Sequence, residues 1–185
     1  MVKKVVVLNA KLMVEVKPKA PFNFDATVHK PSHFPAPIED YVEGVYWQTM
    51  LFGGKVLGLK MENKGTIDNP TIRLTFFSET PLTKKETDAI VKEIQWRFNL
   101  DGDISEFSER FEHDNLLGPV LQKWRGMHVS CGNSLYELLV ISIVLQNATV
   151  RRTVQMIEAL LDEYGTRVRF DGRELYAFWE PKRLH

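Results

Sequence analysis

Apolar and polar residues alternate along much of the first hundred positions, which is the period of a β-strand. The run TIRLTFFS, residues 71–78, shows this alternation, and residues 44–62 contain two further β-rich runs joined through Gly53-Gly54, a two-residue hairpin signal. The apolar run in residues 1–16 is interrupted by polar positions and is typical of two short strands. The first half of the chain therefore predicts an antiparallel sheet.

A helical period follows this region. Thr83 and Glu86 have the spacing of a capping box, and the next apolar residues recur on one face of a helix from about 84 to 98. The pattern then changes for the rest of the chain, and helices are expected near residues 103–112, 114–124, 135–146 and 149–164. We therefore predict an α+β protein with a boundary near residue 100: residues 1–100 form an antiparallel β domain with one packed helix, and residues 101–185 form a helical domain.

The most apolar stretch of the chain is LLVISIVL, residues 138–145. Ser134 and Glu137 form a second capping box ahead of it, which predicts a helix. The stretch is far shorter than the ~20 residues that a membrane span requires. We expect a buried helix and no membrane association.

A polar break, Gln146-Asn147-Ala148-Thr149, separates this helix from the next, which opens on Arg151 and Arg152. The first turn of a helix carries unpaired N–H groups and the positive end of the helix dipole, so cations there are mildly disfavoured. The position of the two arginines therefore calls for an explanation.

Two interpretations of this break remain open. Asn147 or Thr149 can cap the second helix, with the arginines forming an ordinary solvated pair, for example facing Glu158. Alternatively the break is a nucleic-acid contact, in which helix N–H groups and guanidinium groups meet phosphate and the amides of Gln146 and Asn147 reach bases.

The rest of the composition mainly excludes other functions. The 24 basic and 24 acidic residues balance, so any nucleic-acid partner must be met by a local patch. The single cysteine, Cys131, excludes an internal disulfide, is typical of a cytoplasmic protein, and is expected to be a small buried thiol rather than a nucleophile. His29 and His33 have i,i+4 spacing, but Pro31 argues against the helix that would pair them, so no metal site is predicted. No phosphate-binding loop occurs, no cofactor is expected, and no catalytic acid or base can be nominated.

With these residues in view, the chain resembles the helix-hairpin-helix DNA glycosylases, the superfamily containing 3-methyladenine DNA glycosylase II and 8-oxoguanine DNA glycosylase. The resemblance runs from about residue 24 onward, through FDATVHKPSHFPAPIEDYVEGVYWQTM, IQWRFNLDGDISEF and WRGMHVSCGNSLYELLVISIVLQNATVRRTVQMIEALLDEYG to LYAFWEPKRL. Its most specific element is Gln146-Asn147 between two helices.

The resemblance implies a role for the polar break. Such enzymes flip a damaged base out of the duplex, fill the gap with a wedge side chain and cleave the N-glycosidic bond. Asn147 falls at the wedge position, Gln146 precedes it, and Arg152 falls where 8-oxoguanine glycosylases place an arginine that reads the orphaned base. The implied partner is double-stranded DNA with a damaged base or an abasic site, contacted by Gln146, Asn147, Arg151 and Arg152.

The family continues into a Gly-rich hairpin and a catalytic aspartate, with a lysine nucleophile in the bifunctional members, and the sequence reaches His185 before any of these. The leading hypothesis is therefore the N-terminal part of a base-excision glycosylase that is not catalytic alone. The alternative is a stand-alone, non-catalytic DNA- or protein-binding module. Either hypothesis predicts exposed apolar faces on the helices of residues 104–164, and self-association as one way to bury them.

Overall fold

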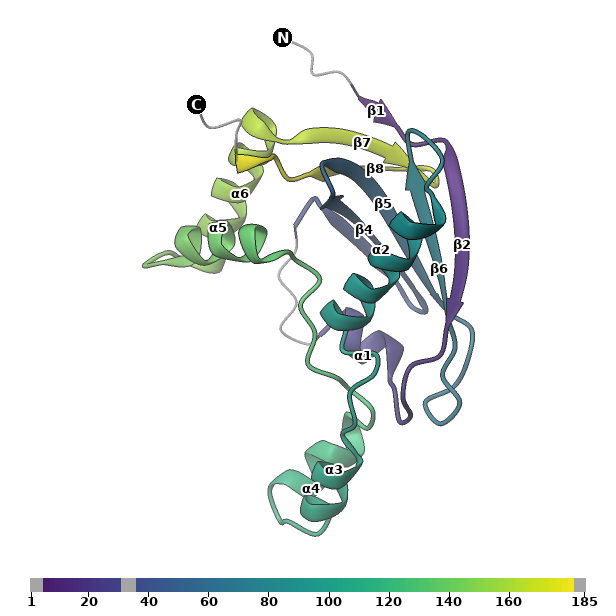
Figure 1. The fold of residues 1–185 in the computed structure, drawn as a ribbon. Coiled ribbons are helices and arrows are strands. Elements are labelled where there is room, and N and C mark those ends of the chain that lie inside the picture. Colours follow the sequence, from purple (N-terminus) through teal and green to yellow (C-terminus); the bar gives the residue numbers. More distant parts are fainter. Residues whose placement is uncertain (1–4, 31–35, 182–185) are drawn as a thin grey trace.

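The main feature of the fold is a five-stranded antiparallel sheet (Figure 1). The computed structural model describes residues 5–30 and 36–181. The strands of the sheet, in their spatial order, are β2 (Ala10–Val16), β6 (Ile72–Ser78), β5 (Lys55–Asn63), β4 (Val45–Phe52) and β3 (Glu39–Val42). The α+β class and the antiparallel sheet predicted from the sequence are confirmed.

The predicted turn between β4 and β5 is present. Phe52 pairs with Lys55, and Gly53 and Gly54 between them have φ of 57° and 76°. Two consecutive positive φ angles match the twist of the flanking strands, and glycine adopts them without steric cost. The turn fixes the register that brings Leu57, Leu59 and Met61 into the core.

One face of this sheet is covered by α2 (Lys84–Arg97), which begins at the predicted capping box of Thr83 and Glu86 (Figure 1). Ile90 and Ile94 of α2 are buried, and they belong to the same apolar cluster as the sheet residues Leu59 and Phe76. The short helix α1 (Phe24–Val28) adds Phe24 and Val28 to this cluster. This is the largest core of the molecule.

A second, three-stranded sheet lies at the other face of the main sheet. Two of its strands come after residue 100, where only helices are predicted from the sequence. It consists of β1 (Val6–Val7), β7 (Thr166–Phe170) and β8 (Arg173–Ala177) in the order β1-β7-β8, with β1 parallel to β7. The turn residues Asp171 and Gly172 have φ of 48° and 73°. Asp-Gly between alternating apolar residues is a strong hairpin signal, so the sequence contained the information that was missed.

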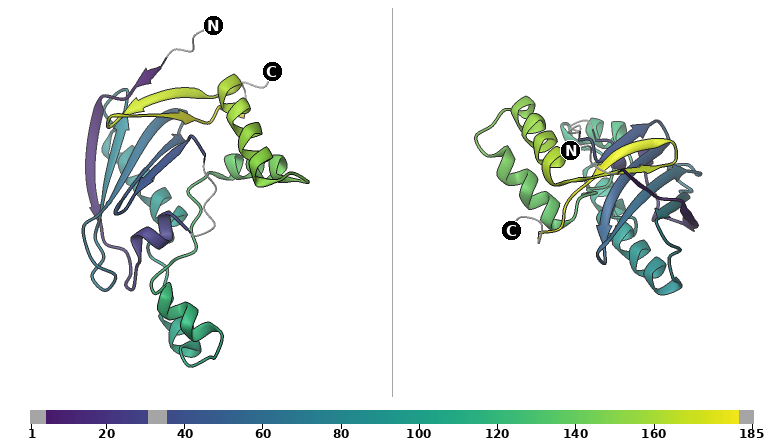
Figure 2. Two further views of the ribbon diagram at one scale, coloured as in Figure 1. Left: turned by 180° about the vertical axis from the view of Figure 1, so that it is seen from behind. Right: turned by 90° about the horizontal axis from the view of Figure 1, so that it is seen from above.

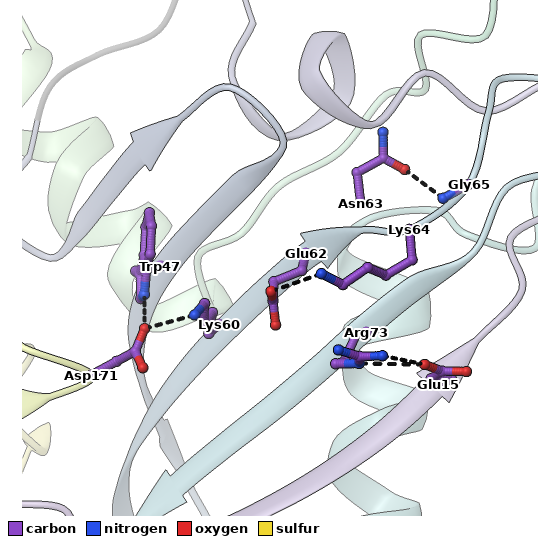
Figure 3. Close-up of polar contacts among 9 residues, drawn as sticks. All are labelled: Glu15, Trp47, Lys60, Glu62, Asn63, Lys64, Gly65, Arg73 and Asp171. Carbon is purple, nitrogen blue, oxygen red and sulfur yellow. Dashed lines mark hydrogen bonds and ion pairs between the residues drawn. The ribbon is translucent and has the colours of Figure 1, made fainter.

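Close backbone approach and a polar cluster hold this hairpin on the main sheet. A Cβ on Gly58 would lie 2.6 Å from the Phe170 ring, so the absence of a side chain lets that ring rest directly on β5. Asp171 accepts a hydrogen bond of 2.8 Å from Trp47 Nε1 and forms an ion pair with Lys60, with 3.0 Å between the two charged atoms (Figure 3). Burial raises the pKa of Asp171, but these two partners outweigh it, and the net shift is downward.

The predicted helices of the second half are all present, with slightly shorter bounds. They are α3 (Ser105–Phe111), α4 (Leu117–Lys123), α5 (Leu135–Leu145) and α6 (Val150–Tyr164). The α3–α4 pair projects away from the sheets, whereas α5 and α6 lie beside the sheets (Figures 1 and 2). The hairpin of β7 and β8 returns to pack on the main sheet. The division of the chain into residues 1–100 and 101–185 stays a prediction.

The expectation of a fully buried α5 is wrong. Tyr136, Val140 and Ile141 of α5 pack against the core formed by α6 and residues 178–179. The opposite side is open, with Leu135 72% and Ile143 66% exposed. A helix that is apolar all round predicts burial on all sides, but within the described residues only one side of α5 has a partner. The predicted exposed apolar surface is therefore present, on α5 and also on α3 and α4.

Candidate nucleic-acid interface

The polar break predicted from the sequence is the tip of the α5–α6 helical pair (Figure 2). Helix α5 ends at Leu145, Gln146 is extended with ψ of 124°, and Asn147 has φ of 53°. Asparagine is among the non-glycine residues that best tolerate this left-handed backbone. The reversal of the chain therefore occurs at Gln146 and Asn147, and both side chains are exposed.

Thr149, and not Asn147, caps α6. Its hydroxyl accepts a hydrogen bond of 3.3 Å from the backbone N–H of Arg152, while the Thr153 hydroxyl donates to the Thr149 carbonyl at 3.0 Å. The capping interpretation of the break is therefore correct for Thr149. Among the described residues the Asn147 amide makes no capping contact, and its side chain is exposed at the tip.

Arg151 and Arg152 lie in the first turn of α6, and both side chains are exposed. Neither guanidinium makes an ion pair within the part of the chain that the structure describes, so the pairing with Glu158 considered above is not formed. No acidic residue lies in this first turn. Two cations without an ion pair among the described residues therefore lie beside the first N–H groups of α6, of which Thr149 caps that of Arg152. Such an arrangement attracts anions.

The tip rests on a rigid base. Thr153, Ile157 and Leu161 form the buried side of α6, and Ile157 and Leu161 pack against Ile38 and Trp179. We call the two sheets, together with α1 and α2, the sheet body. Because these residues are at most 2% exposed, α6 is fixed to the sheet body along most of its length. The tip is a loop between two anchored helices.

A cavity of about 390 Å³ opens next to this tip. It lies between the sheet body and α5, and Leu145, the residue before Gln146, is one of its walls. Its titratable lining groups are those of Lys30, Glu39, Tyr46 and Cys131. Its volume falls within the range of roughly 300–1,000 Å³ that is usual for small-ligand sites.

Burial shifts the pKa values of the groups in this cavity. It raises the pKa of Glu39, although a hydrogen bond from Tyr46 acts in the opposite direction. The pKa of Tyr46 is raised well above its usual value by burial and by Glu39. Burial lowers the pKa of Lys30, opposed by the nearby Cys131 thiol. The cavity therefore disfavours charge on each of these three residues.

Cys131 is exposed, which corrects the expectation of a buried thiol. It lies in the segment that leads into α5, and hydrogen bonds to the sheet body hold this segment. The Cys131 N–H donates to the Arg97 carbonyl at 2.8 Å, and the buried Arg97 guanidinium donates to the Gly132 carbonyl at 2.8 Å. These bonds fix one wall of the cavity.

His128 holds the same segment more deeply. Its ring nitrogens lie 2.7 Å from the Asn99 carbonyl and 3.0 Å from the Pro21 carbonyl, and its backbone N–H donates to the Thr27 hydroxyl. The ring is 1% exposed. We assign it a structural role, because it is buried and joins three parts of the chain.

The predictions on metals and membranes can be compared with the described residues only in part. His29 stacks on Tyr41 with ring centroids 4.2 Å apart, whereas His33 lies outside the described residues. Among residues 5–30 and 36–181, no cluster of three His, Cys, Asp or Glu side chains is placed to hold a metal ion. None of the helices described is both long and apolar enough to cross a membrane.

The tip residues are predicted from the sequence, whereas Lys30, Glu39 and Tyr46 are not. The structure brings Lys30 to Ser130, a residue one hundred positions later. No local spacing links such positions, so a sequence pattern had no signal for the cavity.

Comparisons with known proteins find similarity to DNA glycosylases. No model of a known protein family matches the chain. A DNA-3-methyladenine glycosylase of Bacillus subtilis is 24% identical over 119 residues, which is 64% of this chain and 39% of that protein.

Solved structures show the same fold. The 3-methyladenine DNA-glycosylase of Archaeoglobus fulgidus matches 92% of this chain with a TM-score of 0.75 at 14% identity. The 8-oxoguanine glycosylase/lyase of Clostridium acetobutylicum matches over the whole chain with a TM-score of 0.61 at 16% identity. A further structure of that enzyme, in complex with double-stranded DNA containing cytosine opposite 8-oxoguanine, matches with the same TM-score.

The chain spans only part of these proteins: 39% of the Bacillus protein, 57% of the Archaeoglobus chain and 58% of the Clostridium chain. The described residues therefore have the fold of one part of a DNA glycosylase.

Proposed function

We propose that this chain is the N-terminal, DNA-binding part of a helix-hairpin-helix base-excision glycosylase, and that it binds duplex DNA at a damaged base or an abasic site through Gln146, Asn147, Arg151 and Arg152. The observation that carries this proposal is the exposure of both arginines in the first turn of α6, where they make no ion pair with any described residue and where the helix dipole mildly disfavours a cation. The similarity to DNA glycosylases supports it.

The tip has the shape and chemistry that the role requires. Arg151, Arg152 and the α6 N–H groups contact the phosphate backbone, while Asn147 at the apex enters the gap left by an extrahelical base. An inserted side chain must offset unstacking of about a few kcal/mol per base step. The rigid attachment of α6 favours this, because an ordered wedge loses little entropy on insertion.

We further propose that the chain does not release a base by itself and that it acts on DNA in the cytoplasm. Glu39 is the carboxyl group lining the cavity among the described residues, and Tyr46 donates a hydrogen bond to it. Burial also raises its pKa, so it is poorly suited to stabilise a sugar cation. We expect no base release from a lesion-containing duplex in a single-turnover assay.

The test is equilibrium binding to a duplex with an abasic-site analogue and to the intact duplex, at about 50 mM and about 200 mM salt. We expect preference for the abasic duplex, and Arg152→Ala should weaken binding and reduce the salt slope by about 1. Lys92→Ala is the matched control, because Lys92 is an exposed cation on α2. Equal losses in the two variants, or equal affinity for both duplexes, would contradict the proposal.

The exposed side of α5 favours a second candidate, a protein-binding module that uses this surface, including self-association. Leu135, Leu139 and Ile143 are exposed on one helix, a concentration of apolar residues typical of interaction sites. Sedimentation across a range of concentrations distinguishes the two. A concentration-dependent dimer that Ile143→Ser disrupts, combined with no DNA binding, would favour the second candidate.

A further inference from the structure

The ammonium group of Lys30 lines the cavity beside the tip. Lys30 is half-buried and follows α1, and its Nζ donates a hydrogen bond to the Ser130 carbonyl. Ser130 is itself held in place, because its hydroxyl donates to the Thr27 carbonyl at 2.8 Å. The hydrogen bond therefore fixes where the ammonium lies within the cavity wall.

This ammonium has unused hydrogen-bonding capacity. An ammonium has three N–H donors, and within the described residues one of them has a protein acceptor. The other charged or titratable groups of the lining are Glu39 and Tyr46, which bond to each other, and Cys131, whose thiol is exposed. Lys30 is half-buried, so its ammonium is partly desolvated, and this burial lowers its pKa. A ligand that brings an acceptor oxygen to this half-buried ammonium would gain a hydrogen bond to a charged donor, which favours its binding.

The position of the cavity indicates what that ligand is. Leu145 and Ile141 of α5 form one wall, and the chain continues directly from Leu145 into Gln146 and Asn147 at the tip. The opening therefore lies beside the point at which the proposed function places a displaced base. The lining combines apolar side chains with a few polar groups, as small-ligand pockets do.

We propose that Lys30 makes this cavity selective for an extrahelical base that presents an acceptor oxygen and carries no positive charge. The inference rests on the proposed function and goes beyond it, because the named relatives represent two opposite chemistries. 3-Methyladenine in DNA is a cation, which the ammonium repels, whereas 8-oxoguanine is neutral and presents an additional carbonyl oxygen. The lysine thus argues against transferring the substrate of the Bacillus relative to this chain.

The experiment measures binding of the whole chain to three duplexes that differ at one position: an abasic-site analogue, 8-oxoguanine, and a stabilised 7-methylguanine as the cationic base. We expect about tenfold tighter binding of the 8-oxoguanine duplex than of the 7-methylguanine duplex, the effect of one hydrogen bond to a charged donor. Lys30→Met should remove this preference and leave the affinity for the abasic duplex unchanged. Lys30→Arg should retain part of the preference, and Lys92→Met should retain all of it.

Each other outcome overturns the inference in a recognisable way. Equal affinity of the unmodified chain for the neutral and cationic bases, with abasic binding intact, contradicts the selectivity and leaves the proposed function standing. An equal loss on all three duplexes in Lys30→Met means that the ammonium contacts a phosphate instead of a base. Absence of binding to every duplex at low salt overturns the proposed function and this inference together.

Discussion

The sheet body and the helix α5 are both built from strongly apolar sequence, yet they use that surface differently. In the body, Leu59 and Phe76 are fully buried against α2. In α5, one side packs on the body and the other exposes residues such as Leu139 and Ile143. The comparison shows that apolar sequence predicts a demand for partners, and that in α5 only half of this demand is met within the described residues.

The largest expected contrast is in stability. Phe76→Ala should lower the free energy of unfolding by about 3–5 kcal/mol, because it leaves a cavity in a closed core. Ile143→Ala on the exposed side of α5 should change it by about 0.5 kcal/mol or less. Urea denaturation of both variants measures the difference, and similar losses would show that α5 is covered in solution.

A smaller effect is expected where the second sheet rests on the first. Gly58→Ala places a methyl group against the Phe170 ring, with ring atoms as close as 2.6 Å. We expect a loss of about 1–3 kcal/mol from overpacking. The double variant Gly58→Ala, Phe170→Leu should recover part of this loss. An unchanged stability in Gly58→Ala would mean that the hairpin β7–β8 does not pack on β5 as described.

The cap of α6 is expected to matter by about 1 kcal/mol. Thr149→Ala removes the acceptor for the Arg152 N–H, whereas Thr149→Ser keeps it. Hydrogen exchange should therefore accelerate in the first turn of α6 in the alanine variant only. Equal exchange in the two variants would argue that another group caps the helix.

The smallest effect is the pH dependence from Glu86 in the cap of α2. Lys55 and the cap contacts with Thr83 lower its pKa from 4.5 to about 2. Since the folded-state value is the lower one, this contribution is present above pH 4.5 and is lost as the pH falls toward 2. Acid titration of stability should be shallower in Glu86→Gln than in the unmodified chain. Parallel titrations would contradict the assignment.

The sequence predicted local structure well and long-range partners poorly. The capping boxes at Thr83 and Ser134 and the turn at Gly53-Gly54 depend on neighbours in the chain, and all three are confirmed. The hairpin β7–β8 was missed, although Asp171-Gly172 marked it, because the helical pattern of the preceding segments was extended to the whole of residues 101–185.

The candidate site divides in the same way. Exposure at Gln146 and at the two arginines follows from a polar break between helices, so the sequence identified the tip. Lys30 and the rest of the cavity are assembled from segments about a hundred residues apart. Their proximity depends on how the segment before α5 crosses the sheet body, which no periodicity encodes.

The central claim is that the α5–α6 tip is the DNA-binding surface, and hydrogen exchange with and without an abasic duplex tests it most directly. The N–H groups in the first turn of α6 largely lack intrahelical acceptors and should exchange rapidly in the free chain. We predict that the duplex protects residues 146–152 and leaves the exposed face of α2 around Lys92 unchanged. Protection confined to α2 or to the α3–α4 pair, with none at the tip, would contradict the account.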